Sequence, residues 1–248
     1  MTFAVPEGGA PPPIVLLAGG LASRLGAITR TLPKSLVEIA GEPFIAHQLR
    51  YLAGEGFPDV VICAGHLGEQ IEAFVGDGGR FGCRVRYSWD GAARLGTGGA
   101  IRQALPLLGR RFLVMYGDSY LPIRFRPVWD AFDRAAAVAL MTVFRNERRW
   151  DDSNVEFSGG VIKVYDKVHR TDAMRHIDYG LGILDASVFA PFEAGQPFDL
   201  AELYGALVRE GRLMGYEVQE RFYEIGSVSG IAETDGFLRA RRHSEAIR

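Results

Sequence analysis

From residue 14 onwards the chain alternates short apolar runs with segments of helical periodicity, and this alternation constrains its fold most strongly. The apolar, often β-branched runs predict strands at 14–18, 59–64, 84–89, 112–116 and 138–144. Apolar residues at helical spacing predict helices between them, at 43–54, 67–75, 98–108 and 129–136. Such alternation is typical of a mostly parallel sheet with helices on both faces. We therefore predict an α/β fold with a Rossmann-like, mostly parallel sheet flanked by helices.

Beyond residue 150 the pattern becomes richer in strands. Apolar runs at 154–157 and 161–165 flank Ser158-Gly159-Gly160, which predicts a β-hairpin. The remaining expected elements are strands at 176–184, 214–218 and 222–225 and helices at 200–210 and 231–241. Since no linker-like run separates these parts, we predict a single domain over residues 14–248, with an inserted β-rich face over the carboxyl edge of the sheet. Residues 1–13 are rich in Pro and Gly and predict a disordered leader.

Composition excludes several classes of protein and partner. A net charge of -2 over 248 residues favours neither nucleic acid nor an anionic membrane as partner. The two cysteines, Cys63 and Cys83, indicate neither a disulfide framework nor a zinc site. No apolar run approaches the ~20 residues of a membrane span, and the N-terminus lacks a signal-peptide pattern. We expect a cytoplasmic enzyme, for which the formation of a homo-oligomer stays open.

The first expected strand runs into a segment suited to phosphate. The strand ends at Leu17-Ala18, and Gly19-Gly20 then allow a tight turn close to a ligand. Two cations follow, Arg24 and Lys34, so that backbone N–H groups and fixed positive charge could surround a polyphosphate. The spacing matches neither the P-loop nor the dinucleotide-binding glycine motif.

The longer pattern GGLASRL, followed by LPKSL, resembles the signature of the sugar-1-phosphate nucleotidyltransferases, GGxGTRL followed by PKP. The chain departs from this signature at Ala22, Ser23 and Ser35. The run LGTGGA at 95–100 is similar to a further motif of the family, LGTxGA, and the motifs occur in the family's order. In its length and in this run, the chain resembles most the short members of the family, the hexose- and heptose-1-phosphate guanylyl- and uridylyltransferases.

Two acidic residues are the candidate metal ligands. Asp118 directly follows the strand expected at 112–116, where a carboxylate could hold a hard cation over the sheet. The resemblance assigns Asp118 to Mg²⁺ and, together with Arg24 and Lys34, to catalysis. Glu224 stands where the family commonly carries a second metal-binding Asp. Its longer side chain leaves direct ligation and ligation through water both open.

The resemblance also implies two groups of binding residues. Those expected to bind the nucleotide are Leu17, Ala18, Gly19, Gly20, Gly65, Gly96, Thr97 and Gly98. Those expected to bind the sugar phosphate are Asp166, Lys167, Asp178 and Gly180. Lys167 would contact the phosphate, and Asp166 a sugar hydroxyl. For Tyr179, contact with the sugar and packing in the core stay equally open.

The activity that the resemblance implies is Mg²⁺-dependent condensation of a nucleoside triphosphate with a sugar-1-phosphate, giving an NDP-sugar and pyrophosphate. One alternative is cytidylyl transfer to a non-sugar phosphate such as phosphocholine, which would call for an aromatic cage. The three tryptophans, Trp89, Trp129 and Trp150, are scattered through the sequence. A second alternative is a non-catalytic nucleotide-sensing module, suggested by Glu224. The combined presence of Arg24, Lys34, Asp118 and Lys167 argues against a sensing module.

Overall fold

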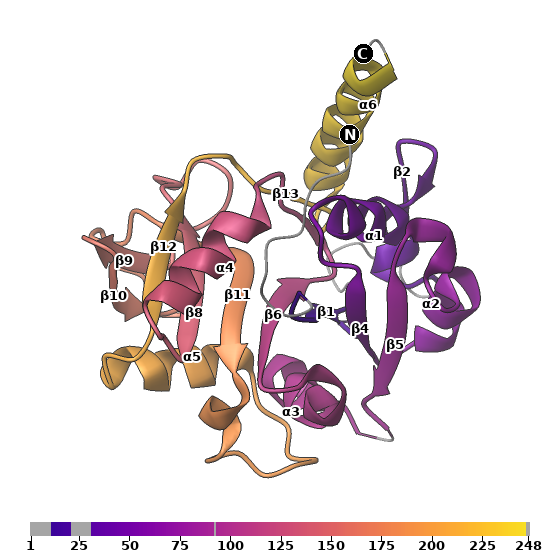
Figure 1. The fold of residues 1–248 in the computed structure, drawn as a ribbon. Coiled ribbons are helices and arrows are strands. Elements are labelled where there is room, and N and C mark those ends of the chain that lie inside the picture. The colour runs from indigo at the N-terminus through magenta and orange to yellow at the C-terminus, as the bar shows by residue number, and fades with distance from the viewer. Residues whose placement is uncertain (1–10, 21–30, 92, 247–248) are drawn as a thin grey trace.

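The computed structural model describes residues 11–20, 31–91 and 93–246, and its centre is a nine-stranded sheet (Figure 1). The strand order is β5-β4-β1-β6-β11-β8-β12-β10-β9. The strands are β1 (Ile14–Leu17), β4 (Asp59–Ala64), β5 (Arg84–Trp89), β6 (Arg111–Tyr116), β8 (Ala139–Phe144), β9 (Val155–Ser158), β10 (Val161–Tyr165), β11 (Ile177–Asp185) and β12 (Met214–Val218). β10 and β11 pair antiparallel with both neighbours, and the other seven strands share one direction. The predicted α/β fold with a mostly parallel sheet is confirmed.

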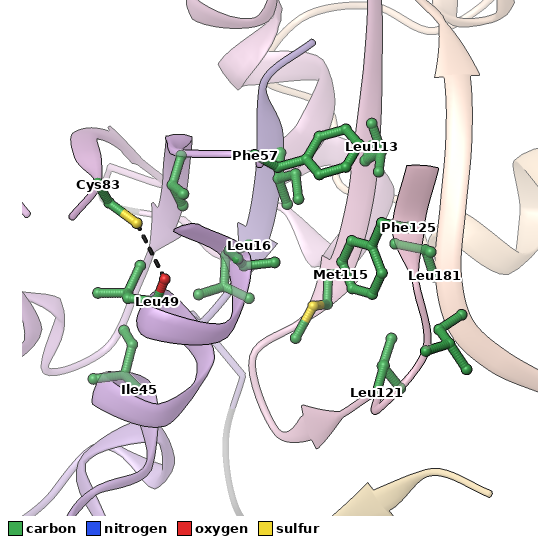
Figure 2. Packing of buried hydrophobic residues seen from close by; sticks show 14 of the residues in the cluster. Leu16, Ile45, Leu49, Phe57, Cys83, Leu113, Met115, Leu121, Phe125 and Leu181 are labelled. Carbon is green, nitrogen blue, oxygen red and sulfur yellow. Dashed lines mark hydrogen bonds between the residues drawn. The ribbon is translucent and has the colours of Figure 1, made fainter. Parts of the chain in front are cut away.

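Helices cover both faces of this sheet. Successive side chains of a strand point to opposite faces, so Leu16 packs into one apolar cluster and Val15 into another. The first cluster lies under α1 (Phe44–Gly54), α2 (Gly68–Val75) and α4 (Phe125–Arg134). The second lies under α3 (Gly96–Leu108) and α5 (Leu200–Arg209). Figure 2 shows the first cluster, in which α1 packs Ile45 and Leu49 beside the strands and the Cys83 thiol donates to the Leu49 carbonyl at 3.2 Å.

The sheet changes its direction of growth between β1 and β6. The chain leaves β1 for β4 and β5 on one side and returns through α3 to form β6 on the other. In such sheets, ligands bind beyond the carboxyl ends of the strands at this point. The Gly117 N–H donates to the Leu17 carbonyl at 2.9 Å, and a Cβ on Gly117 would lie only 2.6 Å from that oxygen. Glycine at this position therefore lets the two strand ends approach closely.

Two further two-stranded ribbons and a long terminal helix lie beside the central sheet. β7 (Ser119–Tyr120) pairs antiparallel with β13 (Tyr223–Glu224), and β2 (Glu38–Ile39) pairs with β3 (Glu42–Pro43). A third apolar cluster joins both ribbons to α6 (Val228–Ala246), whose far end projects beyond the sheet (Figure 1). This packing holds β13 against the chain that leaves β6.

The predicted elements match the observed ones closely, and the largest differences lie at the ends of two helices. α4 begins four residues before its expected start, and α6 extends beyond its expected range at both ends. Among the described residues, no helix is both long and apolar enough to cross a lipid bilayer. Most of the leader expected at 1–13, and Arg24, lie outside the described residues.

Candidate active site

Two cavities meet beyond the carboxyl ends of β1 and β6. The switch-point cavity, of about 380 Å³, lies over the loop after β1 and the start of α3. The hairpin-side cavity, of about 560 Å³, lies towards β10 and β11. Lys34, Tyr116 and Asp118 line both. A ligand in one cavity therefore meets a ligand in the other at these three residues.

Most of the residues expected to bind nucleotide line the switch-point cavity. They are Leu17, Ala18, Gly19, Gly20, Gly96 and Thr97. Gly65 and Gly98 are not among its lining residues. Gly65 lies behind Gly19, where a Cβ on Gly19 would be 3.0 Å from the Gly65 nitrogen. The Gly98 N–H donates to the Phe198 carbonyl at 3.0 Å, and the Phe198 ring occupies the place of a Gly98 side chain. Both glycines allow close packing instead of forming the cavity wall.

Asp90 is a lining residue that the motifs did not reveal. It directly follows β5, so its position at the carboxyl end of a parallel strand was a usable signal. Burial raises the pKa of Asp90, and a hydrogen bond from the backbone of Leu95 opposes that rise.

The remaining unpredicted lining residues are Ser35, Cys63, Arg94, Ala100, Tyr116 and Gly117. Within the described chain, the buried hydroxyls of Ser35 and Tyr116 have no hydrogen-bond partner.

A short ion pair lies where the cavities meet. Lys34 begins the single-turn 3-10 helix Lys34–Leu36, which follows Pro33. Its Nζ lies 2.7 Å from Asp118 Oδ2, while Ser119 Oγ donates to Asp118 Oδ1 at 3.3 Å. The Lys34 side chain is 16% exposed and that of Asp118 is 42% exposed. The carboxylate therefore keeps access to solvent and ligands, while the lysine is largely enclosed.

The β7–β13 ribbon brings Glu224 beside this pair. Glu224 is in register with Ser119, and the Ile225 N–H donates to the Asp118 carbonyl at 3.0 Å. The Glu224 carboxylate accepts hydrogen bonds from Ser227 Oγ, at 2.8 Å, and from the Gly226 N–H. These bonds orient the carboxylate next to the Asp118 segment.

Asp118 and Glu224 together suit Mg²⁺. They supply hard oxygen donors, and Mg²⁺ is commonly held by one or two carboxylates plus substrate phosphates and water. In the part of the chain that the structure describes, no group of three or more His, Cys, Asp or Glu side chains could hold a metal. A cation held by these two carboxylates would take its remaining ligands from a bound polyphosphate and from water.

In the hairpin-side cavity, Lys167 is held between aromatic rings. Its Nζ lies 5.6 Å from the Tyr116 ring centroid and 5.9 Å from that of Tyr165, a geometry of cation–π contact. Burial raises the pKa of Asp178, and the Lys167 charge opposes that rise. The Tyr165 hydroxyl donates to Asp178 at 3.4 Å, and the Gly180 N–H donates to the same carboxylate at 3.1 Å. This arrangement presents one ammonium group over a pocket with a fixed carboxylate.

Asp166 does not reach this cavity. Its carboxylate accepts hydrogen bonds from the N–H groups of Val168, at 2.7 Å, and His169, at 2.8 Å. These bonds lower the pKa of Asp166 and hold the side chain in its own turn. Among the described residues, Asp178 and not Asp166 is the carboxylate that lines the cavity beside Lys167, so contact between Asp166 and a sugar hydroxyl stays a prediction.

Two loops add polar residues to this cavity that sequence patterns did not indicate. They are Asp151, Asp152, Asn154 and Arg170. Arg170 forms an ion pair with Asp152, which joins the loop before β9 to the loop after β10. Such contacts carry no periodic signal in the sequence. Tyr179 belongs to the lining of this cavity, but it is only 1% exposed and its ring packs edge-on against Phe222, so most of the side chain serves the core.

The three tryptophans form no cage in the described structure. None of them lines either cavity. Trp89 stacks with Tyr87, Trp129 packs on Phe132, and Trp150 lies against the Arg221 guanidinium. The aromatic cage that a phosphocholine acceptor would call for is therefore not found among the described residues.

Comparison with known proteins identifies the family of the chain. The sequence model of the nucleotidyl transferase family matches residues 14–174. The chain is 32% identical over 232 residues to N-acetylmuramate alpha-1-phosphate uridylyltransferase from Neisseria meningitidis serogroup B, covering 91% of this chain and 98% of that protein. It is 26% identical to UTP–glucose-1-phosphate uridylyltransferase from Synechocystis, covering 86% of this chain and 60% of that protein.

A similar fold is found among solved structures. A candidate glucose-1-phosphate thymidylyltransferase from Bacillus anthracis, solved in complex with sucrose, superposes with a TM-score of 0.79 at 20% identity. The superposition covers 91% of this chain and 94% of that one, which supports the fold. The chain therefore belongs to the nucleotidyl transferase family, and the sugar-1-phosphate nucleotidyltransferase activity indicated by its motifs is confirmed.

Proposed function

We propose that this enzyme transfers a uridylyl group from UTP to a sugar-1-phosphate in a Mg²⁺-dependent reaction. The observation that carries the proposal is the shared boundary of the two cavities at Lys34, Tyr116 and Asp118. A triphosphate in the switch-point cavity and a sugar-1-phosphate in the hairpin-side cavity would bring their phosphates together at this boundary. The names of two similar relatives, both uridylyltransferases, support UTP as the donor.

In the proposed reaction, a phosphate oxygen of the acceptor attacks the α-phosphorus of UTP. One P–O bond forms to the acceptor, and the bond between the α-phosphorus and the β-phosphate bridging oxygen breaks, so pyrophosphate leaves with its electron pair. The acceptor phosphate is ionised at neutral pH, so the residues supply alignment and charge instead of a general base. Lys34 neutralises the transferring phosphate, while Lys167 positions the acceptor phosphate. Mg²⁺ held by Asp118 and Glu224 would neutralise charge between the two phosphates.

A matrix of five nucleoside triphosphates against a panel of sugar-1-phosphates, followed through pyrophosphate release, tests this function. We expect the largest kcat/KM with UTP and a sugar-1-phosphate. Preference for another triphosphate would contradict the donor, and the absence of pyrophosphate release with every pair would favour the nucleotide-sensing alternative. Omitting the sugar-1-phosphate provides the control for simple hydrolysis of the triphosphate.

Asp90 is proposed to select the base. Its half-buried carboxylate lines the switch-point cavity and can accept a hydrogen bond from the imino N–H of uracil. Cytosine presents a lone pair at that position, so an ionised Asp90 would disfavour it. We expect Asp90→Asn to lower the kcat/KM ratio of UTP over CTP by about tenfold or more. An unchanged ratio in the folded variant would remove Asp90 from base selection.

Arg170 is proposed to favour an acceptor that carries a carboxylate, as N-acetylmuramate 1-phosphate does. Arg170 lines the hairpin-side cavity, where Lys34 and Lys167 are the cations proposed to serve the phosphates. N-Acetylglucosamine 1-phosphate is the matched substrate, because it differs only in lacking the 3-O-lactyl group that carries this carboxylate. We expect Arg170→Gln to reduce kcat/KM for N-acetylmuramate 1-phosphate by about tenfold relative to N-acetylglucosamine 1-phosphate. Equal effects on both substrates would contradict this role.

A further inference from the structure

The Lys34 ammonium group lies beside the two carboxylates of the proposed metal site, those of Asp118 and Glu224. Lys34 Nζ lies 2.7 Å from Asp118 Oδ2. On its other side, Nζ lies 3.0 Å from the place that a Cβ on Gly226 would take, a place that the Glu224 carboxylate also touches. The ammonium group is therefore close to both acidic side chains at once.

The two lysines of the site differ in this respect. Lys167 contacts the Tyr116 and Tyr165 rings, and no ion pair joins it to a carboxylate within the described residues. Lys34 is 16% exposed and paired directly with Asp118. Lys34 therefore pairs directly with Asp118, whereas the charge of Lys167 acts on Asp178.

A divalent cation and this ammonium group would compete for Asp118. Mg²⁺ binds carboxylate oxygen at about 2.0–2.1 Å, so a cation on Asp118 Oδ2 would lie within a few Å of the Lys34 Nζ that is already paired with this atom. Two cations at such close range repel strongly in a partly buried site. A triphosphate in the switch-point cavity offers Lys34 alternative oxygens, because Lys34 also lines that cavity.

We propose that Lys34 is an internal counter-ion that occupies the metal position until the bound triphosphate draws it away. The proposal rests on the function and metal ligands proposed above. It makes metal and nucleotide mutually dependent: the cation binds weakly to the nucleotide-free enzyme, and the triphosphate raises its affinity by freeing Asp118. By linkage, the cation raises the affinity for the triphosphate by the same factor.

The test measures Mn²⁺ binding to the nucleotide-free enzyme by titration of the free-ion EPR signal. Lys34→Met keeps a long side chain without the charge, and we expect it to bind Mn²⁺ at least about tenfold more tightly than the wild type. Lys34→Gln should shift the affinity in the same direction. Lys167→Met is the matched control, because it removes one charge from the same cavity without freeing Asp118, and we expect a change of about threefold or less.

Melting temperature gives a second readout that does not depend on turnover. Mn²⁺ should raise the melting temperature of nucleotide-free Lys34→Met by more than that of the wild type, because a ligand stabilises the folded state according to its affinity. Adding UTP to the wild type should raise its Mn²⁺ affinity, and this gain should shrink in Lys34→Met. Circular dichroism verifies that each variant is folded.

Two results would overturn the proposal while leaving the proposed function intact. One is unchanged or weaker Mn²⁺ binding in both folded Lys34 variants, and the other is an equal gain in Lys34→Met and Lys167→Met. Failure of the metal site itself is distinguishable. If Asp118→Asn binds Mn²⁺ together with UTP as tightly as the wild type does, both the metal ligand and the counter-ion role are wrong.

Discussion

Replacement of Asp118 by Asn is expected to lower kcat by at least about 10²-fold without unfolding the protein. The substitution preserves shape but removes a negative charge at the point where the two cavities meet. The proposed cation would lose its solvent-accessible carboxylate ligand, so charge that develops on the transferring phosphate would lack its partner. Lys34 would also lose its 2.7 Å ion pair and become free to bind phosphate, so the KM for the triphosphate should change less than kcat.

The experiment compares steady-state pyrophosphate release by Asp118→Asn and by a surface control at saturating Mg²⁺. Asp133→Asn is a suitable control, because Asp133 is 59% exposed, pairs with Arg111 and lines neither cavity. We expect the control to retain wild-type kcat. Turnover of folded Asp118→Asn within a few-fold of the wild type would contradict the catalytic role of Asp118.

The second large effect is expected from Gly117→Ala, through geometry alone. The added Cβ would lie 2.6 Å from the Leu17 carbonyl oxygen and 3.0 Å from the Ala18 Cα. Both atoms belong to backbone, so the ends of β1 and β6 must separate. We expect a loss of about 1–3 kcal/mol in the free energy of unfolding. Since a displacement of about 1 Å can cost 10²-fold in rate, we also expect kcat/KM to fall by about 10²-fold.

Urea unfolding and pyrophosphate release measure the two parts of this prediction. Gly205→Ala is the matched control, because its Cβ would meet only the flexible Arg209 side chain, at 3.5 Å. Within α5, alanine should leave stability unchanged or raise it by about 0.5–1 kcal/mol. If Gly117→Ala matched Gly205→Ala in stability and activity, close approach at the switch point would not be required.

The elements of the fold were readable because they depend on residues that are neighbours in the chain. Apolar alternation and helical spacing are local, and β4, β5, β10 and β12 occupy their expected ranges. Helix starts were less accurate, since α4 begins at Phe125, a buried residue of the first apolar cluster. Tertiary packing lengthened this helix beyond its local signal.

Cavity residues at strand ends could be predicted from the sequence, and those on loops could not. The places of Gly19, Gly20 and Asp118 in the cavity wall were predictable because carboxyl ends of parallel strands meet at one edge. Asp90 obeys the same rule and was overlooked only because it lacks a motif. Arg170 and Asp152 had no comparable signal, since they come together through the path of two loops.

The sequence by itself determined the succession of strands and helices along the chain, the glycines that follow β1 and the acidic residue after β6, because each depends on a few successive side chains. Only the tertiary structure decided which charged groups share a site. The ribbon of β7 and β13 places Glu224 beside Ser119, although the two are far apart in the chain. The turn after β10 holds Asp166 away from the cavity that Asp178 lines. Strand register and loop direction arise from packing over the whole sheet, and they determine where each carboxylate lies.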